Sequence, residues 1–198
     1  MMNVTKQCAA FALLAGCATS TLISQQSNPD YVGKSFKSVM VVAVTADDLL
    51  RRTYEDRMVA LLGKRGRKGI PSYAVVGSRG QVEEADLRQA IAKSGAEGVL
   101  LTRVTRVDRS SGTVPGATVA VGVGFYGYYS TVWQTVEVAP EKITGPSWTY
   151  SETRLFDAKT GALAWTGTVE TRENDDLGAA LTQYIDLIFD TMVNNRVL

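Results

Sequence analysis

The first half of the chain predicts three strands separated by two helices. Residues 37–45 (KSVMVVAVT) are β-branched and apolar, as in a strand buried on both faces. After Asp47, apolar residues recur at helical spacing from Leu50 to Leu61, and Gly95 is the expected stop of the second helix. The five elements are expected at 37–45, 47–63, 72–77, 81–94 and 98–107. Because β-α-β crossovers are right-handed, these strands are expected to be parallel.

The second half has a different pattern and predicts an antiparallel meander closed by a helix. Strands are expected near 118–125, 129–139, 147–157 and 162–171. Residues 157–161 (DAKTG) form the turn before the last strand, and Asn174 caps the closing helix. The expected fold class is therefore α/β (α+β), a mixed sheet built from an N-terminal β-α-β-α-β half and the meander, with a closing C-terminal helix.

A short apolar run at the N-terminus has the features of a secretory signal peptide. Lys6 precedes the run, which begins at Cys8 and ends in Leu14-Ala15-Gly16-Cys17. This ending resembles the lipobox of bacterial lipoproteins. The resemblance implies cleavage before Cys17, a diacylglyceryl group on its sulfur and an acylated amino terminus. The expected division is a signal peptide at 1–16, a lipidated N-terminus and polar tether at 17–35, and one domain at 36–198.

The location follows from the same motif. The apolar run is far shorter than the ~20 residues that span a bilayer, so it is not expected to be a transmembrane helix. Two or three acyl chains anchor a protein stably, whereas a single chain does not. In lipoproteins an Asp after the cysteine favours the inner membrane, and this chain has Ala18. We therefore expect a lipid anchor in the outer membrane, on its periplasmic face.

Composition excludes several kinds of chemistry. The chain has 21 basic and 20 acidic residues, so no overall field would attract nucleic acid. It has no histidine, and its two cysteines, Cys8 and Cys17, both lie in the signal region. A Ser-His-Asp triad, a thiol nucleophile and a His- or Cys-based metal site cannot be built from the mature chain. We expect neither an enzyme nor a cofactor.

Several motifs together resemble small periplasmic lipoproteins of unknown function. They are the apolar strand at 38–42, the strand entry at 95–101 (GAEGVLL) and the late hairpin at 154–165 (RLFDAKTGALAW). The wider group includes the curli-secretion lipoprotein, the penicillin-binding-protein activator lipoproteins and the N-terminal domain of the Tol-system β-propeller protein. The resemblance implies binding to other envelope proteins, or assembly, and it supplies no catalytic residues.

The residues expected to contact a partner form an aromatic cluster near three glycines. They are Phe125, Tyr126, Tyr128, Tyr129 and Trp133. At a hairpin tip these side chains can enter a partner's groove or a membrane interface. The alternative is that they fold back onto their own sheet. A ring of such hairpins could form a pore, although the valines of 119–125 alternate with small rather than polar residues.

The remaining motifs have simpler interpretations. The basic run at 64–68 (KRGRK) is either a solvated loop, which we favour, or a contact for anionic lipid. The glycines of 122–127 match GxGxxG, but no helix is expected after them, so no phosphate site is expected. The acidic pairs at 47–48, 83–84 and 175–176 are interpreted as helix caps.

The sequence thus predicts a lipid-anchored, non-catalytic accessory protein that binds another envelope component. Two alternatives remain open. One is a subunit of an oligomeric outer-membrane secretion channel, and the other is a hydrolase that uses Ser, Lys or carboxylate chemistry.

Overall fold

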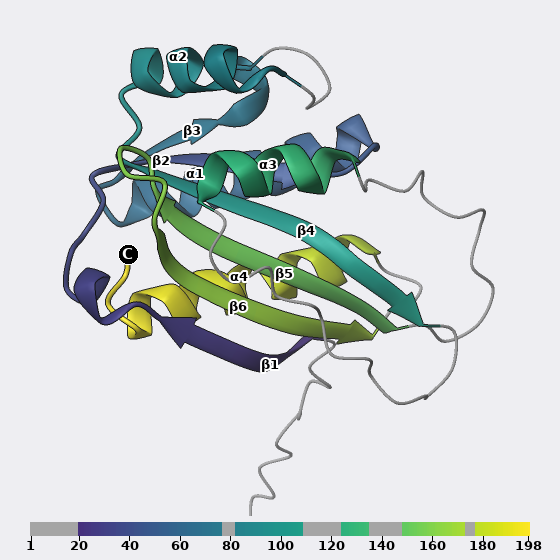
Figure 1. The fold of residues 1–198 in the computed structure, drawn as a ribbon. Coiled ribbons are helices and arrows are strands. Elements are labelled where there is room, and N and C mark those ends of the chain that lie inside the picture. Colours follow the sequence, from purple (N-terminus) through teal and green to yellow (C-terminus); the bar gives the residue numbers. More distant parts are fainter. Residues whose placement is uncertain (1–19, 77–81, 109–123, 135–147, 173–176) are drawn as a thin grey trace, which may run out of the picture.

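A computed structural model describes residues 20–76, 82–108, 124–134, 148–172 and 177–198 (Figure 1). These residues form strands, α-helices and two short 3₁₀ helices around one sheet. In chain order the elements are β1 (Ser20–Ser27), η1 (Pro29–Tyr31), β2 (Ser38–Val44), α1 (Asp48–Lys64), β3 (Lys68–Pro71), η2 (Ser72–Ala74), α2 (Glu84–Ser94), β4 (Gly98–Asp108), α3 (Phe125–Gln134), β5 (Trp148–Asp157), β6 (Leu163–Arg172) and α4 (Leu177–Asn194).

The sheet is mixed, as the sequence predicts. Its six strands are ordered β1-β6-β5-β4-β2-β3. Strand β2 pairs in parallel with β3 and with β4, which confirms the β-α-β-α-β half. The pairs β4–β5, β5–β6 and β6–β1 are antiparallel. The fold is therefore α+β, with a parallel half and an antiparallel half in one sheet.

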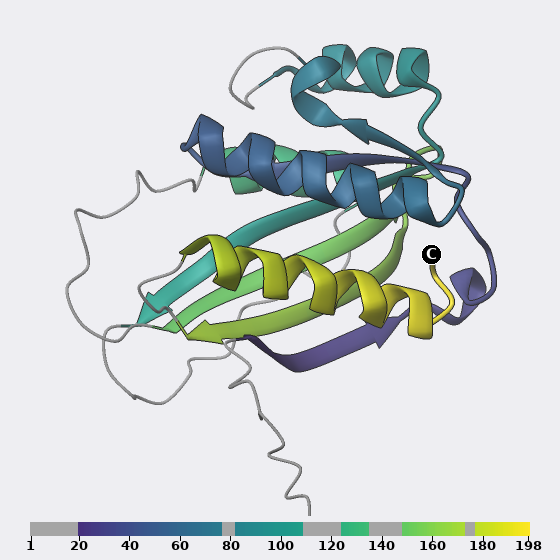
Figure 2. The ribbon, with the colours of Figure 1, turned by 180° about the vertical axis from the view of Figure 1, so that it is seen from behind.

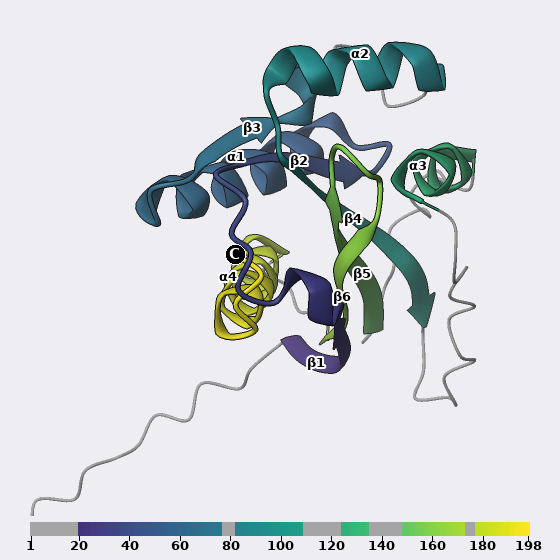
Figure 3. The ribbon, with the colours of Figure 1, turned by 60° about the vertical axis from the view of Figure 1, so that its left-hand side comes forward.

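Each face of the sheet has its own hydrophobic core. Helices α1 and α4 cover one face, where Met58 and Ile188 are buried together with Trp165 of β6 (Figure 2). Helices α2 and α3 lie on the other face, where Leu87 and Phe125 are buried. Seen from the side, α4 and α3 lie on opposite sides of the antiparallel strands (Figure 3). The sheet is thus the middle layer of three.

Local signals in the sequence set several element ends. The Asp47 carboxylate accepts hydrogen bonds from the N–H groups of Leu49 (2.8 Å) and Leu50 (3.0 Å), so it caps α1 as predicted. Helix α2 ends at Gly95, whose φ of 72° is in the left-handed region. Gly161 has the same φ in the turn between β5 and β6, so the predicted turn is confirmed.

Two parts of the predicted layout are wrong. The polar segment expected as a tether contains strand β1, which pairs with β6 from Ser20 to Ser27 with one irregularity at Ile23. The second strand lies at Lys68–Pro71 rather than at 72–77, because Pro71 ends the ladder and Ser72–Ala74 turn into η2. Polar residues suit β1 because it is an edge strand that stays largely exposed to water. Among the described helices, none has the length and apolar character that crossing a bilayer requires.

Candidate functional site

The aromatic cluster lies on a helix and not at a hairpin tip. Residues 125–134 form α3, so the strand expected at 129–139 is wrong over 129–134, and its remainder lies outside the described residues. Phe125, Tyr126, Tyr128 and Tyr129 are buried against the sheet, while Trp133 is partly buried. The alternative that these aromatics pack on their own sheet is therefore confirmed. Partner contact through them stays a prediction, but its premise of an exposed tip is wrong.

The glycine motif before this cluster also differs from expectation. Helix α3 begins at Phe125, so the glycines do lead into a helix. The Phe125 N–H donates to the Gly161 carbonyl at 2.9 Å, so the adjacent turn uses this donor. Only residues 122–123 of the motif lie outside the described residues, and a helix start alone does not make a phosphate site.

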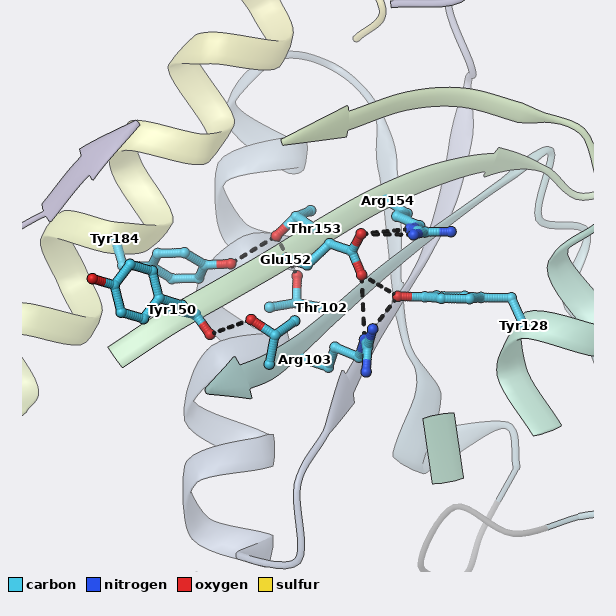
Figure 4. A network of polar contacts seen from close by, with 9 residues as sticks. Thr102, Arg103, Tyr128, Tyr150, Glu152, Thr153, Arg154 and Tyr184 are labelled. Atoms are coloured by element: carbon cyan, nitrogen blue, oxygen red, sulfur yellow. Dashed lines mark hydrogen bonds and ion pairs between the residues drawn. The ribbon is translucent and has the colours of Figure 1, made fainter. Parts of the chain in front are cut away.

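A buried ionic cluster lies where α3 crosses β4 and β5 (Figure 4). Glu152 of β5 is at its centre, with a side chain only 6% exposed. One carboxylate oxygen accepts two hydrogen bonds from Arg154, at 2.7 and 2.9 Å. The other accepts from the Tyr128 hydroxyl at 2.5 Å and from Arg103 Nε at 3.2 Å. Arg154 also stacks 4.0 Å from the Tyr128 ring centre. Three elements are therefore joined through one carboxylate.

The protonation of this cluster follows from its charges. Burial by itself raises the pKa of Glu152, but the Tyr128 hydrogen bond and the two guanidinium groups outweigh it, so the net pKa is lowered. Burial and the adjacent carboxylate raise the pKa of Tyr128 well above its usual value. Glu152 is thus held ionised and Tyr128 neutral. A carboxylate bound to three donors in this way suits a structural role better than proton transfer.

The opposite face of the sheet holds a chain of hydroxyl groups. Tyr54 of α1 bonds Thr102 at 2.7 Å, Thr102 bonds Thr153 at 2.8 Å, and Thr153 bonds Tyr184 of α4 at 2.7 Å. Burial is the largest cause that raises the pKa of Tyr54, and it raises that of Tyr184 to about 12. Both phenols are therefore neutral at physiological pH, and the chain links α1 to α4 through β4 and β5.

A second buried carboxylate hydrogen-bonds a serine hydroxyl, as a serine nucleophile would require, but the group is closed to solvent. Glu55 of α1 accepts from Ser72 Oγ at 2.7 Å, from Arg51 Nε at 3.3 Å and from the Ala43 N–H at 3.0 Å. Ser72 is only 1% exposed, so a substrate cannot reach its hydroxyl. The group fixes η2 and the start of α1 against the end of β2. Its residues do not form an accessible nucleophile.

Sequence reasoning missed both carboxylates, although each left a signal. Glu152 and Arg154 alternate onto one face of β5, and the β4–β5 register places Arg103 directly opposite Glu152. Arg51 and Glu55 are four residues apart on the inner face of α1. The sequence gives the spacing of these charged residues, but only the strand register and the packing show that they are buried together.

The structure describes some of the other predicted features, and the rest lie outside the described residues. In the basic run, Arg67 donates to the Phe36 carbonyl at 2.7 Å and Lys68 begins β3, so the run is not wholly a solvated loop. Asp47 caps its helix, Glu83 precedes α2 without a side-chain cap bond, and residues 175–176 lie outside the described part. Cys17 also lies outside it. The described residues contain no group of three potential metal ligands.

Comparison with known proteins gives remote structural neighbours only. No protein-family profile matches the chain, and no curated protein sequence matches it. The fold is similar to the PelC dodecamer subunit from Paraburkholderia phytofirmans, with 14% identity and a TM-score of 0.48 over 90% of this chain and 99% of PelC. Lipoprotein GNA1162 from Neisseria meningitidis has 16% identity and a TM-score of 0.42, covering 79% and 98% of the two chains. These values establish no shared function, and the resemblance to the curli-secretion, activator and Tol groups stays a prediction.

Proposed function

We propose that this chain is a lipid-anchored, non-catalytic accessory protein of the bacterial cell envelope, held at the periplasmic face of the outer membrane, where it binds another envelope component. The observation that carries the proposal is the Leu14-Ala15-Gly16-Cys17 motif, which comes three residues before the first strand of the sheet. The motif supports acylation at Cys17. Strand β1, which begins at Ser20, limits the length of chain between the proposed anchor and the sheet.

The short connection gives the proposal a geometric consequence. Three residues span at most about 11 Å when fully extended. Ser20 already pairs with Thr171 of β6, so the start of β1 would lie within that reach of an acylated Cys17. The antiparallel half of the sheet would therefore lie beside the head groups, rather than stand off on a long tether. An accessory protein in this position meets its partners at the membrane surface.

The two buried carboxylates support the non-catalytic part of the proposal. Glu152 and Glu55 each accept hydrogen bonds from at least three groups. Both tie secondary structure elements together, and Ser72 beside Glu55 is sealed from solvent. These are properties of structural ion pairs. Among the residues that the structure describes, we find nothing that favours the hydrolase or the secretion channel over the accessory role.

The anchor is tested by replacing one cysteine at a time in the full chain. Cys17→Ala is expected to leave the protein in the soluble periplasmic fraction or as an uncleaved precursor. Cys8→Ala is the matched control, because Cys8 is the only other cysteine and lies in the predicted signal peptide. The control is expected to fractionate with outer membranes like the unaltered protein. If Cys17→Ala stays with the outer membrane in processed form, the proposed anchor is wrong.

A further inference from the structure

The two edges of the sheet are protected to very different degrees. Strand β3 at one edge has only four residues, begins with Lys68 and ends with Pro71. A short strand, a lysine and a proline are three devices by which proteins prevent edge-to-edge pairing. Strand β1 at the other edge has eight residues and contains neither a charged residue nor a proline. Only one edge of this sheet is therefore protected by its sequence.

The unprotected edge is also accessible. Within the described residues β1 pairs with β6 alone, so no described strand bonds the other side of its backbone. Most of its side chains are exposed, and Ile23 is 49% exposed. One register irregularity lies between Leu22 and Ser24, and regular pairing with β6 resumes from Ser24 to Ser27. Such an edge can accept a further strand through main-chain hydrogen bonds.

We propose that the free edge of β1 pairs antiparallel with β1 of a second copy of this chain, which makes one continuous sheet across a two-fold axis. The side chains of β1 are Ser, Thr, Gln, Leu and Ile, so two copies meet without like charges. A head-to-tail contact with β3 is prevented by Lys68 and Pro71. Pairing of β1 with itself is isologous, because both copies use the same strand. It leaves no long edge for a third copy, so the assembly ends at a dimer.

This inference goes beyond the proposed function and does not require it. If Cys17 is acylated, the anchor holds every copy in one plane and raises the effective concentration of the β1 edges. If Cys17 is not acylated, the β1 edges of two copies can still pair in solution.

The register of β1 provides a direct test. Thr21 lies opposite Glu170 and Gln26 lies opposite Thr166, so Thr21 and Gln26 face the same side of the sheet. Their partners on β6 are four residues apart, so the two positions are separated by about 13 Å along the strand. In an antiparallel pair whose two-fold axis passes through the middle of β1, a cysteine at Thr21 lies close to one at Gln26 of the other copy. In a parallel pair each position would instead meet itself.

Disulfide crosslinking of the full chain in isolated envelopes distinguishes these arrangements. Cells that co-express differently tagged Thr21→Cys and Gln26→Cys chains are expected to yield a mixed dimer on mild oxidation, at least fivefold above either variant alone. The chain without an added cysteine gives the background from Cys17. A dimer in that background would count against acylation of Cys17 and leave the test of β1 pairing intact.

A charge variant tests the same edge without relying on disulfides. The double variant Ser24→Lys and Gln26→Lys places like charges across the proposed axis and is expected to convert the detergent-purified dimer to a monomer in light scattering. Its matched control carries Gln89→Lys and Ala92→Lys, two exposed positions on α2, and is expected to stay a dimer. A monomeric unaltered protein that also gives no mixed disulfide overturns the proposal. So does like-with-like crosslinking at Thr21, or a dimer that survives the β1 lysines.

Discussion

Replacing Glu152 by Gln tests whether the ionic cluster beneath α3 stabilises the fold. Glu152 is 6% exposed and Arg154 is 3% exposed at their side chains, so this pair is screened from water. The substitution keeps the size of the side chain and one acceptor oxygen, but it removes the negative charge. Arg154 and Arg103 are then left close together without their counter-ion.

The expected loss follows from the burial of the pair. Removing one partner of a buried ion pair costs about 3–5 kcal/mol, and the oxygen that Gln retains places Glu152→Gln near the lower end. For a domain of this size each kcal/mol corresponds to a shift of about 2–4 °C in Tm. We therefore expect Tm to fall by at least about 6 °C. The measurement is urea and thermal unfolding followed by circular dichroism and by tryptophan fluorescence, to which the buried Trp165 contributes.

The same substitution has a defined pH dependence. The pKa of Glu152 is lower in the folded protein than the value of about 4.3 for an unfolded chain. Its contribution to the free energy of unfolding is therefore fully present above that value and is lost as pH falls through the folded pKa. The difference between the unaltered protein and Glu152→Gln should be constant near pH 7 and should shrink below about pH 4.

An exposed pair supplies the matched control. Glu84 and Arg88 on α2 form an i,i+4 ion pair whose side chains are 56% and 53% exposed. Glu84→Gln makes the same chemical change where water screens the charges, so it should cost less than about 1 kcal/mol. If Glu152→Gln is as mild as Glu84→Gln, or if its effect is the same at pH 3 and pH 7, the ionic cluster does not stabilise the fold as argued.

Two further substitutions test packing and capping. Gly167→Ala should destabilise the protein by about 1–3 kcal/mol in urea unfolding, because the new Cβ would lie 2.3 Å from the Trp165 ring in a closely packed core; an unchanged midpoint would refute that packing. Asp47→Ala removes the acceptor for the Leu49 and Leu50 N–H groups and should cost about 1 kcal/mol, whereas Asp47→Asn should cost less; equal losses from the two would contradict the capping role.

The parallel half of the fold could be predicted because its signals are local. The apolar strand at 37–45, the cap at Asp47 and the stop at Gly95 each depend on neighbours in sequence. The hairpin at Asp157–Gly161 is of the same kind, since Asp157 accepts from the N–H groups of Lys159 and Thr160. Such elements form by the same rules in any fold.

Helix α3 was missed because two signals conflict in its sequence. Glycines and aromatic residues favour strands and turns, which predicts a hairpin. However, Phe125, Tyr128, Tyr129 and Val132 recur at helical spacing, and these are the residues that pack on the sheet. The tertiary contact with Phe156, at 5.3 Å between ring centres from Phe125, outweighs local propensity. Here the helical spacing of the apolar residues indicates the correct secondary structure, and the residue types do not.

Strand β1 and the Glu152 cluster could not be predicted, because both depend on partners distant in sequence. Ser20–Ser27 has no apolar alternation, and it becomes a strand only because β6 pairs with it across more than 130 residues. In the sequence, Glu152 is one of several polar residues in a strand that alternates between polar and apolar positions. The donors that reach it from other elements are Arg103 on β4 and Tyr128 on α3, which the sequence does not place.

We propose that Cys17 anchors the domain to a membrane. Intact-mass spectrometry of the native protein, extracted from its own membrane, tests this claim most directly. The expected species is a chain that begins at Cys17 and carries the added mass of a diacylglyceryl group and an amino-terminal acyl chain. A mature chain with an unmodified Cys17, or one that still begins at Met1, would contradict it.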